Sequence, residues 1–284
     1  FKHSRICGIS MAAWDGEVAQ CYYFPIRHQT GERQLPVGPV LSGVRSILEN
    51  ERITKIAHNI KFDEHMLARE GIAILGPRRD SMVEAQLYDE NSPLSLKERA
   101  LIDLKDERAK VFESLLDDVV EKQAKAAKMG KEAYRKQFGY ARIPVMTCGV
   151  YACYDVEFTL RLGKFYDDVG VRRFFAAPYE IEMELSKAIF EMEETGMPVD
   201  TNYFEWLAEA TGAEKERLKP LLFAQAGQWE FNPDSDDDVR QLVCGRLGLE
   251  NRLWKHTDGG AWAVDKEVLE SFADEFPVLE TLRE

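Results

Sequence analysis

Two short stretches of the chain place carboxylates and a phenol at helical spacing. In the run KIAHNIKFDEHML, Asn59 lies four residues before Asp63. In the run VYACYDVE, Tyr151 lies four residues before Asp155. Residues four apart lie on one face of a helix, so each pair presents its polar groups together. Carboxylates bind divalent metal, and a metal ion with an oriented water can hydrolyse a phosphodiester, which makes this the candidate chemistry.

Each stretch alone also has a purely structural interpretation. An Asp near a helix start is more often a cap or a partner of the helix dipole than a metal ligand. A Tyr four residues before an Asp is common on amphipathic helices. The chemical interpretation therefore depends on the order and the context of the two stretches.

The order and the spacing of these two stretches resemble those of a known family. Asn59 and Phe62-Asp63, followed after a long helical region by Tyr151-x-x-x-Asp155, resemble the second and third motifs of the DEDD 3′-5′ exonucleases. The tyrosine corresponds to the subclass called DEDDy. More narrowly, the pattern resembles the proofreading domain of family A DNA polymerases, the DNA polymerase I class. Phe62 stands where relatives often carry tyrosine, a departure that leaves the metal ligands unchanged.

The resemblance implies a reaction and a role for each residue. The reaction is removal of mononucleotides from single-stranded or primer-template DNA 3′ ends, with two Mg²⁺ or Mn²⁺ ions. Asp155 would ligate the ion that binds the nucleophile, and Asp63 would hold the second ion, mainly through water. Tyr151 would orient the attacking water. Asn59 would position the site or contact the DNA backbone.

Composition is that of a globular protein without a membrane anchor. The 284 residues are 45% hydrophobic and 31% charged, and no apolar run approaches the roughly 18 residues that span a bilayer. No signal-peptide pattern opens the chain, so the cytoplasm is the expected location, with a phage or organellar enzyme as plausible as a bacterial one. The five cysteines are odd in number and form no C-x-x-C pair. A net charge of −13 argues against coating nucleic acid by electrostatics alone.

The N-terminal pattern predicts an α/β fold. Residues 5–11 and 19–26 are strand-like around an Asp-Gly turn signal, which predicts a hairpin. Helices are expected at 40–49, 62–70 and 83–88, the last capped by Asp80, with a strand at 53–57. The order implies a mixed sheet flanked by helices, which matches the ribonuclease H-like fold of the resembled family.

Residues 94–138 are expected to be helical and highly charged, with lysine and arginine concentrated at 124–136. A solvated helical arm explains this composition, and a basic surface that guides single-stranded DNA is the alternative.

The C-terminal part resembles the start of a polymerase domain. A helix is expected from Tyr179, and the EETGMPVD run at 193–200 resembles the segment that opens the polymerase part of family A enzymes. The FNPDS run at 231–235 resembles a turn in their thumb, although a helix capped by Asn232, Asp234 or Ser235 explains it completely. We therefore expect an exonuclease domain over 1–176 and a mainly helical, partial thumb over 177–284. No match to the palm and fingers is found, so no nucleotide incorporation is expected from these residues.

The first motif of the resembled family is an Asp-x-Glu at the end of an apolar strand. Asp15-Gly16-Glu17 matches this pattern, but it lies where the hairpin turn must be, whereas the family's motif precedes the hairpin. Without the motif-bearing strand, the hairpin could not join the strand at 53–57 in one sheet. We therefore expect an Asp-x-Glu shortly before Phe1.

Two other functions remain open. A catalytically silent exonuclease-like platform of a DNA polymerase would keep the fold and bind DNA without hydrolysis. A stand-alone RNA-trimming exonuclease, similar to ribonuclease D, would share Asp63, Tyr151 and Asp155 but should lack the thumb-like segments.

Overall fold

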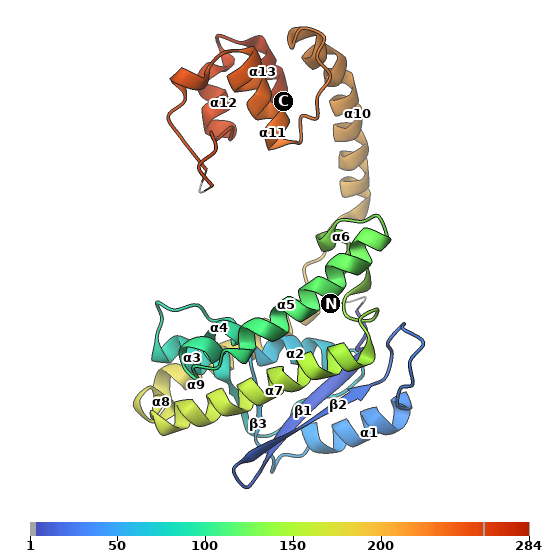
Figure 1. Cartoon of the computed structure of the whole chain (residues 1–284), viewed down its shortest axis with the longest axis vertical. Helices are drawn as coiled ribbons and strands as arrows, with labels where there is room; N and C mark the ends of the chain where they lie inside the picture. Colours follow the sequence, from blue (N-terminus) through green and yellow to red (C-terminus); the bar gives the residue numbers. More distant parts are fainter. Residues whose placement is uncertain (1–3, 258, 284) are drawn as a thin grey trace. The chain divides into compact units, whose positions relative to one another are not determined.

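The computed structural model describes residues 4–257 and 259–283. The chain divides into two compact units, one ending at Gly196 and the other beginning at Met197. In the first unit, a strand hairpin precedes short strands that alternate with helices, and long helices follow (Figure 1). The second unit is mainly helical. Within the residues described, no helix combines the length and the apolar character needed to cross a membrane.

The first two strands form an antiparallel hairpin. β1 (Gly8–Asp15) pairs with β2 (Val18–Pro25) along its whole length. Gly16 turns the chain with a φ of +61°, a conformation that glycine adopts without strain. The predicted hairpin is therefore confirmed, and Asp15-Gly16-Glu17 lies at its turn.

A second sheet is small and parallel. β3 (Lys55–Ala57) pairs with β4 (Arg78–Asp80), and α2 (Ile60–Ala68) and α3 (Ser81–Tyr88) follow these strands. No strand ladder joins this sheet to the hairpin within residues 4–257 and 259–283. The predicted α/β class is confirmed, although the strands described form two small sheets instead of the single mixed sheet that the sequence predicts.

One core of the first unit lies beside α1 (Val37–Leu48). This helix begins three residues before the predicted start, and Pro39 stands in its first turn, where a missing N–H does not break the helix. The side chains buried here come from both ends of the hairpin region, from α1 and from the end of α2: Ile6, Ile26, Val44, Leu67 and Ile72.

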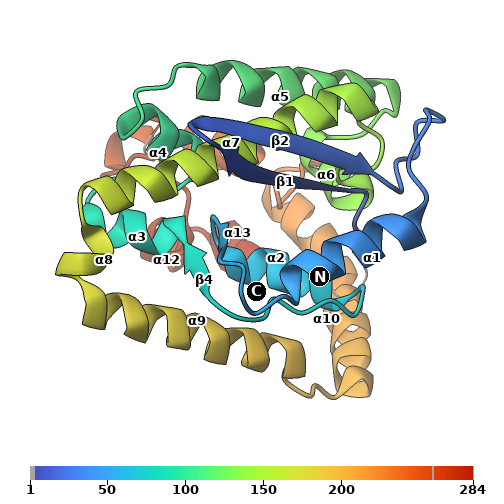
Figure 2. The same cartoon turned by 90° about the horizontal axis from the view of Figure 1, so that it is seen from below.

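The longest helix of the first unit, α7 (Val145–Asp168), contacts both sheets (Figure 2). A Cβ at Gly149 would lie 3.0 Å from the Tyr23 ring of β2. A Cβ at Gly163 would lie 2.3 Å from Ile56 Cδ1 of β3. Glycine at these two positions therefore allows α7 to approach both the hairpin and the parallel sheet.

The charged helical region consists of α4 (Leu96–Ile102), α5 (Arg108–Ala126) and α6 (Lys131–Phe138). Lys131 and Arg135 both pair with Asp117, so part of the positive charge of this region is neutralised. The solvated arm and the DNA-guiding surface both remain predictions. Side chains from α5, α6 and α7 form a core here: Leu116, Val120, Ala124, Tyr134, Ile143 and Cys148.

Two further helices, α8 (Val171–Phe174) and α9 (Ala176–Thr195), complete the first unit. α9 packs against α2 and α3, and Glu194 near its end shares a 2.6 Å hydrogen bond with His65 and forms an ion pair with Arg69 of the α2 region. The compact unit consequently extends to Gly196, whereas the predicted domain boundary lies at 176. The predicted boundary marks where one family domain is expected to end and the next to begin. Packing alone does not test it, so it stays a prediction.

The second unit opens with α10 (Thr201–Gln225), capped by Asp200. α11 (Asp236–Arg240) continues as a π-helical turn over 241–246, and Ser235 caps it by accepting the N–H of Asp238. A 3₁₀ turn at Glu250–Arg252 precedes the last two helices, α12 (Lys266–Ala273) and α13 (Pro277–Arg283). The capped helix predicted after residue 235 is confirmed.

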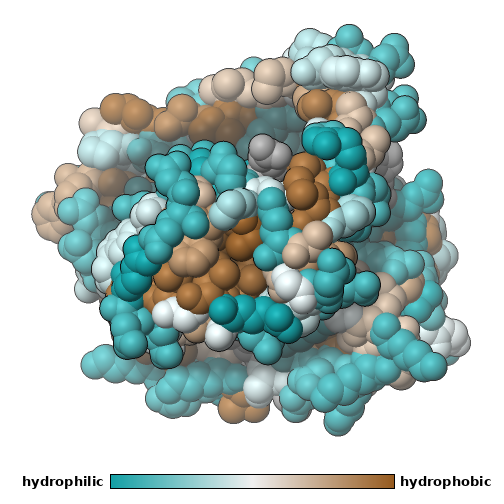
Figure 3. All heavy atoms as spheres, turned by 90° about the horizontal axis from the view of Figure 1, so that it is seen from above, coloured by the Kyte–Doolittle hydropathy of each residue, from teal (hydrophilic) through white to brown (hydrophobic). Residues whose placement is uncertain are grey.

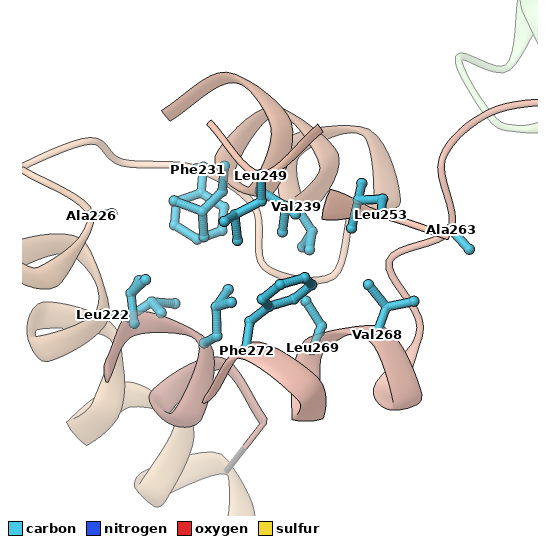
Figure 4. Close-up of a cluster of buried hydrophobic side chains, with 14 residues drawn as sticks. Leu222, Ala226, Phe231, Val239, Leu249, Leu253, Ala263, Val268, Leu269 and Phe272 are labelled. Carbon is cyan, nitrogen blue, oxygen red and sulfur yellow. The ribbon is translucent and has the colours of Figure 1, made fainter. Parts of the chain in front are cut away.

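Hydrophobic side chains from α10 to α13 point toward one another in the core of the second unit (Figure 4). α10 contributes to this core near its C-terminal end, through Leu222, and Ala226 directly after the helix adds to it. Hydrophobic residues also reach the molecular surface between hydrophilic ones (Figure 3). Around the start of α10, Met197, Phe204 and Trp206 are exposed.

Candidate functional site

Tyr151 and Asp155 lie one turn apart on α7, as the sequence predicts. Phe158, Leu162 and Tyr166 of the same helix are completely buried. Each large apolar side chain buried in this way contributes about 1.5–3 kcal/mol to stability, so the orientation of α7 is well fixed. The Asp155 side chain is 28% exposed, which leaves it within reach of solvent.

A lysine from α4 joins this pair. The Lys97 ammonium forms an ion pair with the Asp155 carboxylate. The same Nζ lies 4.4 Å from the centroid of the Tyr151 ring, within the range of a cation–π interaction. Ser95 caps α4 by accepting the N–H of Glu98, which fixes the turn that carries Lys97. Lys97, Tyr151 and Asp155 therefore form one group of contacting side chains.

A second tyrosine supports Tyr151. The rings of Tyr140 and Tyr151 stack with 6.3 Å between centroids and an interplanar angle of 24°. Their side chains also share a hydrogen bond. Tyr140 therefore restricts the orientation of the Tyr151 phenol.

The start of α2 is held by a buried carboxylate. Asn59 precedes the helix with a φ of +66°, a left-handed conformation that asparagine tolerates better than most residues. The backbone N–H groups of Asn59 and Ile60 each donate a 2.9 Å hydrogen bond to Asp80. Asp80 is only 2% exposed and also accepts the N–H of Met82, which caps α3. The predicted Asp80 cap is confirmed, and the same side chain also positions α2.

Asp63 lies in the first turn of α2 and is exposed. Protein atoms nevertheless surround its carboxyl group closely. This desolvation, together with the negative charges of Asp80 and Glu64, raises the pKa of Asp63 to about 7. Water still reaches the group, so Asp63 is a surface carboxyl in a negatively charged setting. A bound cation would relieve the repulsion between these carboxylates.

The structure places Tyr151 and Asp155 one turn apart on α7, as predicted. Asp63 lies in the first turn of α2, but Asn59 stands just before this helix in a left-handed conformation, so the two do not share a helical face as the sequence predicted. Among the residues that the structure describes, no three His, Cys, Asp or Glu side chains form a group that could hold a metal ion. Asp15 and its neighbours at the hairpin turn therefore complete neither pair.

Sequence reasoning does not identify Lys97 or the second role of Asp80. Lys97 does carry a local signal, because it lies inside the Ser95–Glu98 capping box, in the first turn of the helix, where a positive charge opposes the helix dipole. The bond from Asp80 to the start of α2 joins residues about 20 apart and has no comparable signal.

Replacing Asn59 with valine is expected to destabilise the protein by about 1–2 kcal/mol, because a β-branched residue is strained in the left-handed conformation. Asn59→Gly accepts this conformation and should cost much less. Urea unfolding of both variants measures the difference. If Asn59 also contacts the DNA backbone, the glycine variant should bind a DNA 3′ end more weakly at nearly unchanged stability. A valine variant as stable as the wild type would contradict the left-handed start of α2.

Comparisons with known proteins match the part of the chain that contains these candidate residues. A family described as 3′-5′ exonuclease, of DNA polymerase A, matches residues 3–166. DNA polymerase I of Chloroflexus aurantiacus is 30% identical over 97% of this chain and 27% of its own length. DNA polymerase I of Synechocystis is 25% identical over 99% of this chain and 27% of its own length. The DNA polymerase of Escherichia phage T5 is 27% identical over 85% of this chain and 29% of its own length.

A solved structure shares the fold. It is the POL domain of Pol1 from M. smegmatis in complex with DNA primer-template and dNTP, and it matches with a TM-score of 0.53 at 17% identity, over 85% of this chain and 36% of that one. The present chain spans only about a quarter of the DNA polymerase I sequences that it resembles. The match to the family model, over more than half of the residues, shows that the chain belongs to the 3′-5′ exonuclease family of DNA polymerase A.

Proposed function

We propose that this chain is the 3′-5′ exonuclease portion of a larger DNA polymerase and hydrolyses phosphodiester bonds at DNA 3′ ends. The observation that supports this most is the placement of Tyr151 and Asp155 on one face of α7, inside the segment that the exonuclease family matches. The relatives named DNA polymerase I are much longer than this chain, so the polymerase function of the whole protein belongs to the proposal.

The types of the donor groups suit a hard divalent cation. Mg²⁺ is commonly held by one or two carboxylates, with water and substrate phosphates as its other ligands. Asp63 and Asp155 supply carboxylates of this kind. We assign both as ligands of Mg²⁺ or Mn²⁺ and propose two ions in the working site. When bound, such ions supply positive charge for the leaving oxygen and acidify the attacking water.

The other residues act on the substrate and on the water. Tyr151, one turn from Asp155 and supported by Tyr140, orients the attacking water through its hydroxyl group. Asn59 lies one turn before Asp63 and contacts the DNA backbone near the 3′ end. These two side chains position the reacting groups, which is a large part of the rate enhancement in such reactions.

The substrates and the setting follow from the same proposal. The chain acts on single-stranded 3′ ends and on the primer end of primer-template DNA, together with the rest of the polymerase chain. The relatives come from bacteria and from a phage, which favours action in a bacterial cytoplasm.

One observation favours a second candidate, a catalytically silent platform that binds DNA within a polymerase. Asp155 already has a partner, because Lys97 forms an ion pair with it. A carboxylate that stayed neutralised in this way would not hold a catalytic ion.

A nuclease assay separates these functions. The full-length protein is incubated with 5′-labelled single-stranded DNA or RNA of the same sequence, with Mg²⁺ or with EDTA. We expect DNA to shorten one nucleotide at a time with Mg²⁺ and to stay intact with EDTA or with a blocked 3′ end. Faster loss of RNA would instead indicate an RNA-trimming exonuclease. Stable DNA and RNA would indicate the silent platform.

A further inference from the structure

Lys97 is a buried lysine at a position that disfavours lysine. It is 8% exposed, and it is the second residue of α4, where the helix dipole opposes a positive charge. Lysine is almost never fully buried unless its charge is paired, because removing an ammonium group from water costs free energy. Interactions elsewhere in the fold must therefore offset this cost.

The offsetting interactions come from α7. The Asp155 carboxylate supplies the opposite charge, and the Tyr151 ring lies 4.4 Å from the ammonium nitrogen. The Phe158 ring lies 5.5 Å from it on the same helix. Two of these three partners are the residues to which the proposed function assigns a metal ion and the attacking water.

We infer that Lys97 is an internal cation that competes with the divalent metal ion for Asp155. The inference rests on the proposed function, because it takes Asp155 to be a metal ligand. An ammonium ion and a divalent ion are attracted by the same carboxylate, and at this range they repel each other. Lys97 therefore weakens metal binding to the DNA-free protein. It is a positioning residue, since it acts on the reaction only through Asp155 and Tyr151.

Competition of this kind couples metal binding to DNA binding. A DNA phosphate adds negative charge beside Asp155, which lets the carboxylate hold a metal ion in spite of Lys97. By linkage, DNA then strengthens metal binding and the metal strengthens DNA binding by the same factor. Without the lysine charge, DNA should strengthen metal binding by a smaller factor.

Binding of Mn²⁺ alone to the full-length protein, without DNA, tests this directly. Electron paramagnetic resonance measures free Mn²⁺, so no catalytic activity is needed. Lys97→Met, which keeps the length of the side chain, is expected to bind Mn²⁺ at least about tenfold more tightly than the wild type, because the competing charge is gone. Lys97→Arg keeps the charge and should resemble the wild type. Adding Asp155→Asn to Lys97→Met should abolish the gain.

Each outcome decides the inference. Equal Mn²⁺ affinity of the wild type and Lys97→Met overturns it, as does a gain that persists without the Asp155 carboxylate. A purely structural lysine would give the first of these results. Lys97→Gln is the second neutral variant, and thermal unfolding confirms that each protein is folded. Exonuclease activity of the wild type is measured separately. If the wild type is active but binds Mn²⁺ as tightly as Lys97→Met does, the proposed function stands and the role of Lys97 is rejected. If the wild type is inactive but Lys97→Met binds Mn²⁺ more tightly, the role of Lys97 stands and the proposed function is rejected.

Discussion

Replacing Asp155 with alanine is expected to slow hydrolysis at a DNA 3′ end by at least roughly 1000-fold. A direct metal ligand supports several kcal/mol of transition-state stabilisation, and each ~1.4 kcal/mol changes a rate tenfold. Single-turnover hydrolysis of labelled DNA at saturating Mg²⁺ measures this loss. Tyr151→Phe removes only the hydroxyl that orients the water and should cost about 100-fold.

A second effect of Asp155→Ala must be separated from the first. Removing Asp155 leaves the Lys97 ammonium buried without its carboxylate, and such a change costs about 3–5 kcal/mol of stability. Combining it with Lys97→Met should restore much of the stability and none of the activity. The matched control replaces Asp15 and Glu17, the exposed carboxylates of the hairpin turn, with alanine and should leave hydrolysis nearly intact. Loss of activity in this control alone would show that the catalytic carboxylates had been misplaced.

Replacing Asp80 with alanine should produce the largest loss of stability among the cap residues. The buried carboxylate accepts the N–H groups of Asn59, Ile60 and Met82, and all three would lose their partner. Hydrogen bonds to a charged group contribute about 1.5–3 kcal/mol each, and partial relaxation reduces the sum, so we expect a loss of about 3–5 kcal/mol. Urea unfolding followed by circular dichroism measures it.

Ser95→Ala is the matched control for Asp80→Ala. Ser95 also caps a helix of the first unit, but it is exposed and accepts only the N–H of Glu98. Its loss should cost about 1 kcal/mol. Equal losses in the two variants would show that the bonds from Asp80 to the start of α2 add little. Since Asn59 and Asp63 lie at the start of α2, hydrolysis by Asp80→Ala should also be slower under conditions where the protein remains folded.

Local structure was largely predictable from the sequence. The hairpin follows from alternating residues around Asp15-Gly16, and the caps of α3 and α11 follow from Asp80 and Ser235. Each of these features depends on residues within a few positions of one another. The helical spacing of Tyr151 and Asp155 is also a local feature, because one turn of helix brings the two residues together without help from the rest of the fold.

Packing between segments far apart in the sequence was less predictable. α9 belongs by packing to the first unit, although its sequence suggests the start of another domain. Its Glu194 pairs with His65 and Arg69, which lie about 125–129 positions earlier in the chain. Side-chain contacts over such sequence separations leave no trace in a local pattern of hydrophobic and polar residues.

The sequence by itself determined the α/β class, the hairpin, the helix caps and the candidate residues Asn59, Asp63, Tyr151 and Asp155. Only the tertiary structure showed that Lys97 pairs with Asp155 and that α7 contacts two separate sheets. The physical reason is that helical periodicity identifies the face on which a side chain lies, whereas its partner depends on how that face packs against elements far away in the chain. A lysine in a charged region looks like a solvated residue until packing removes it from water and places it against a carboxylate.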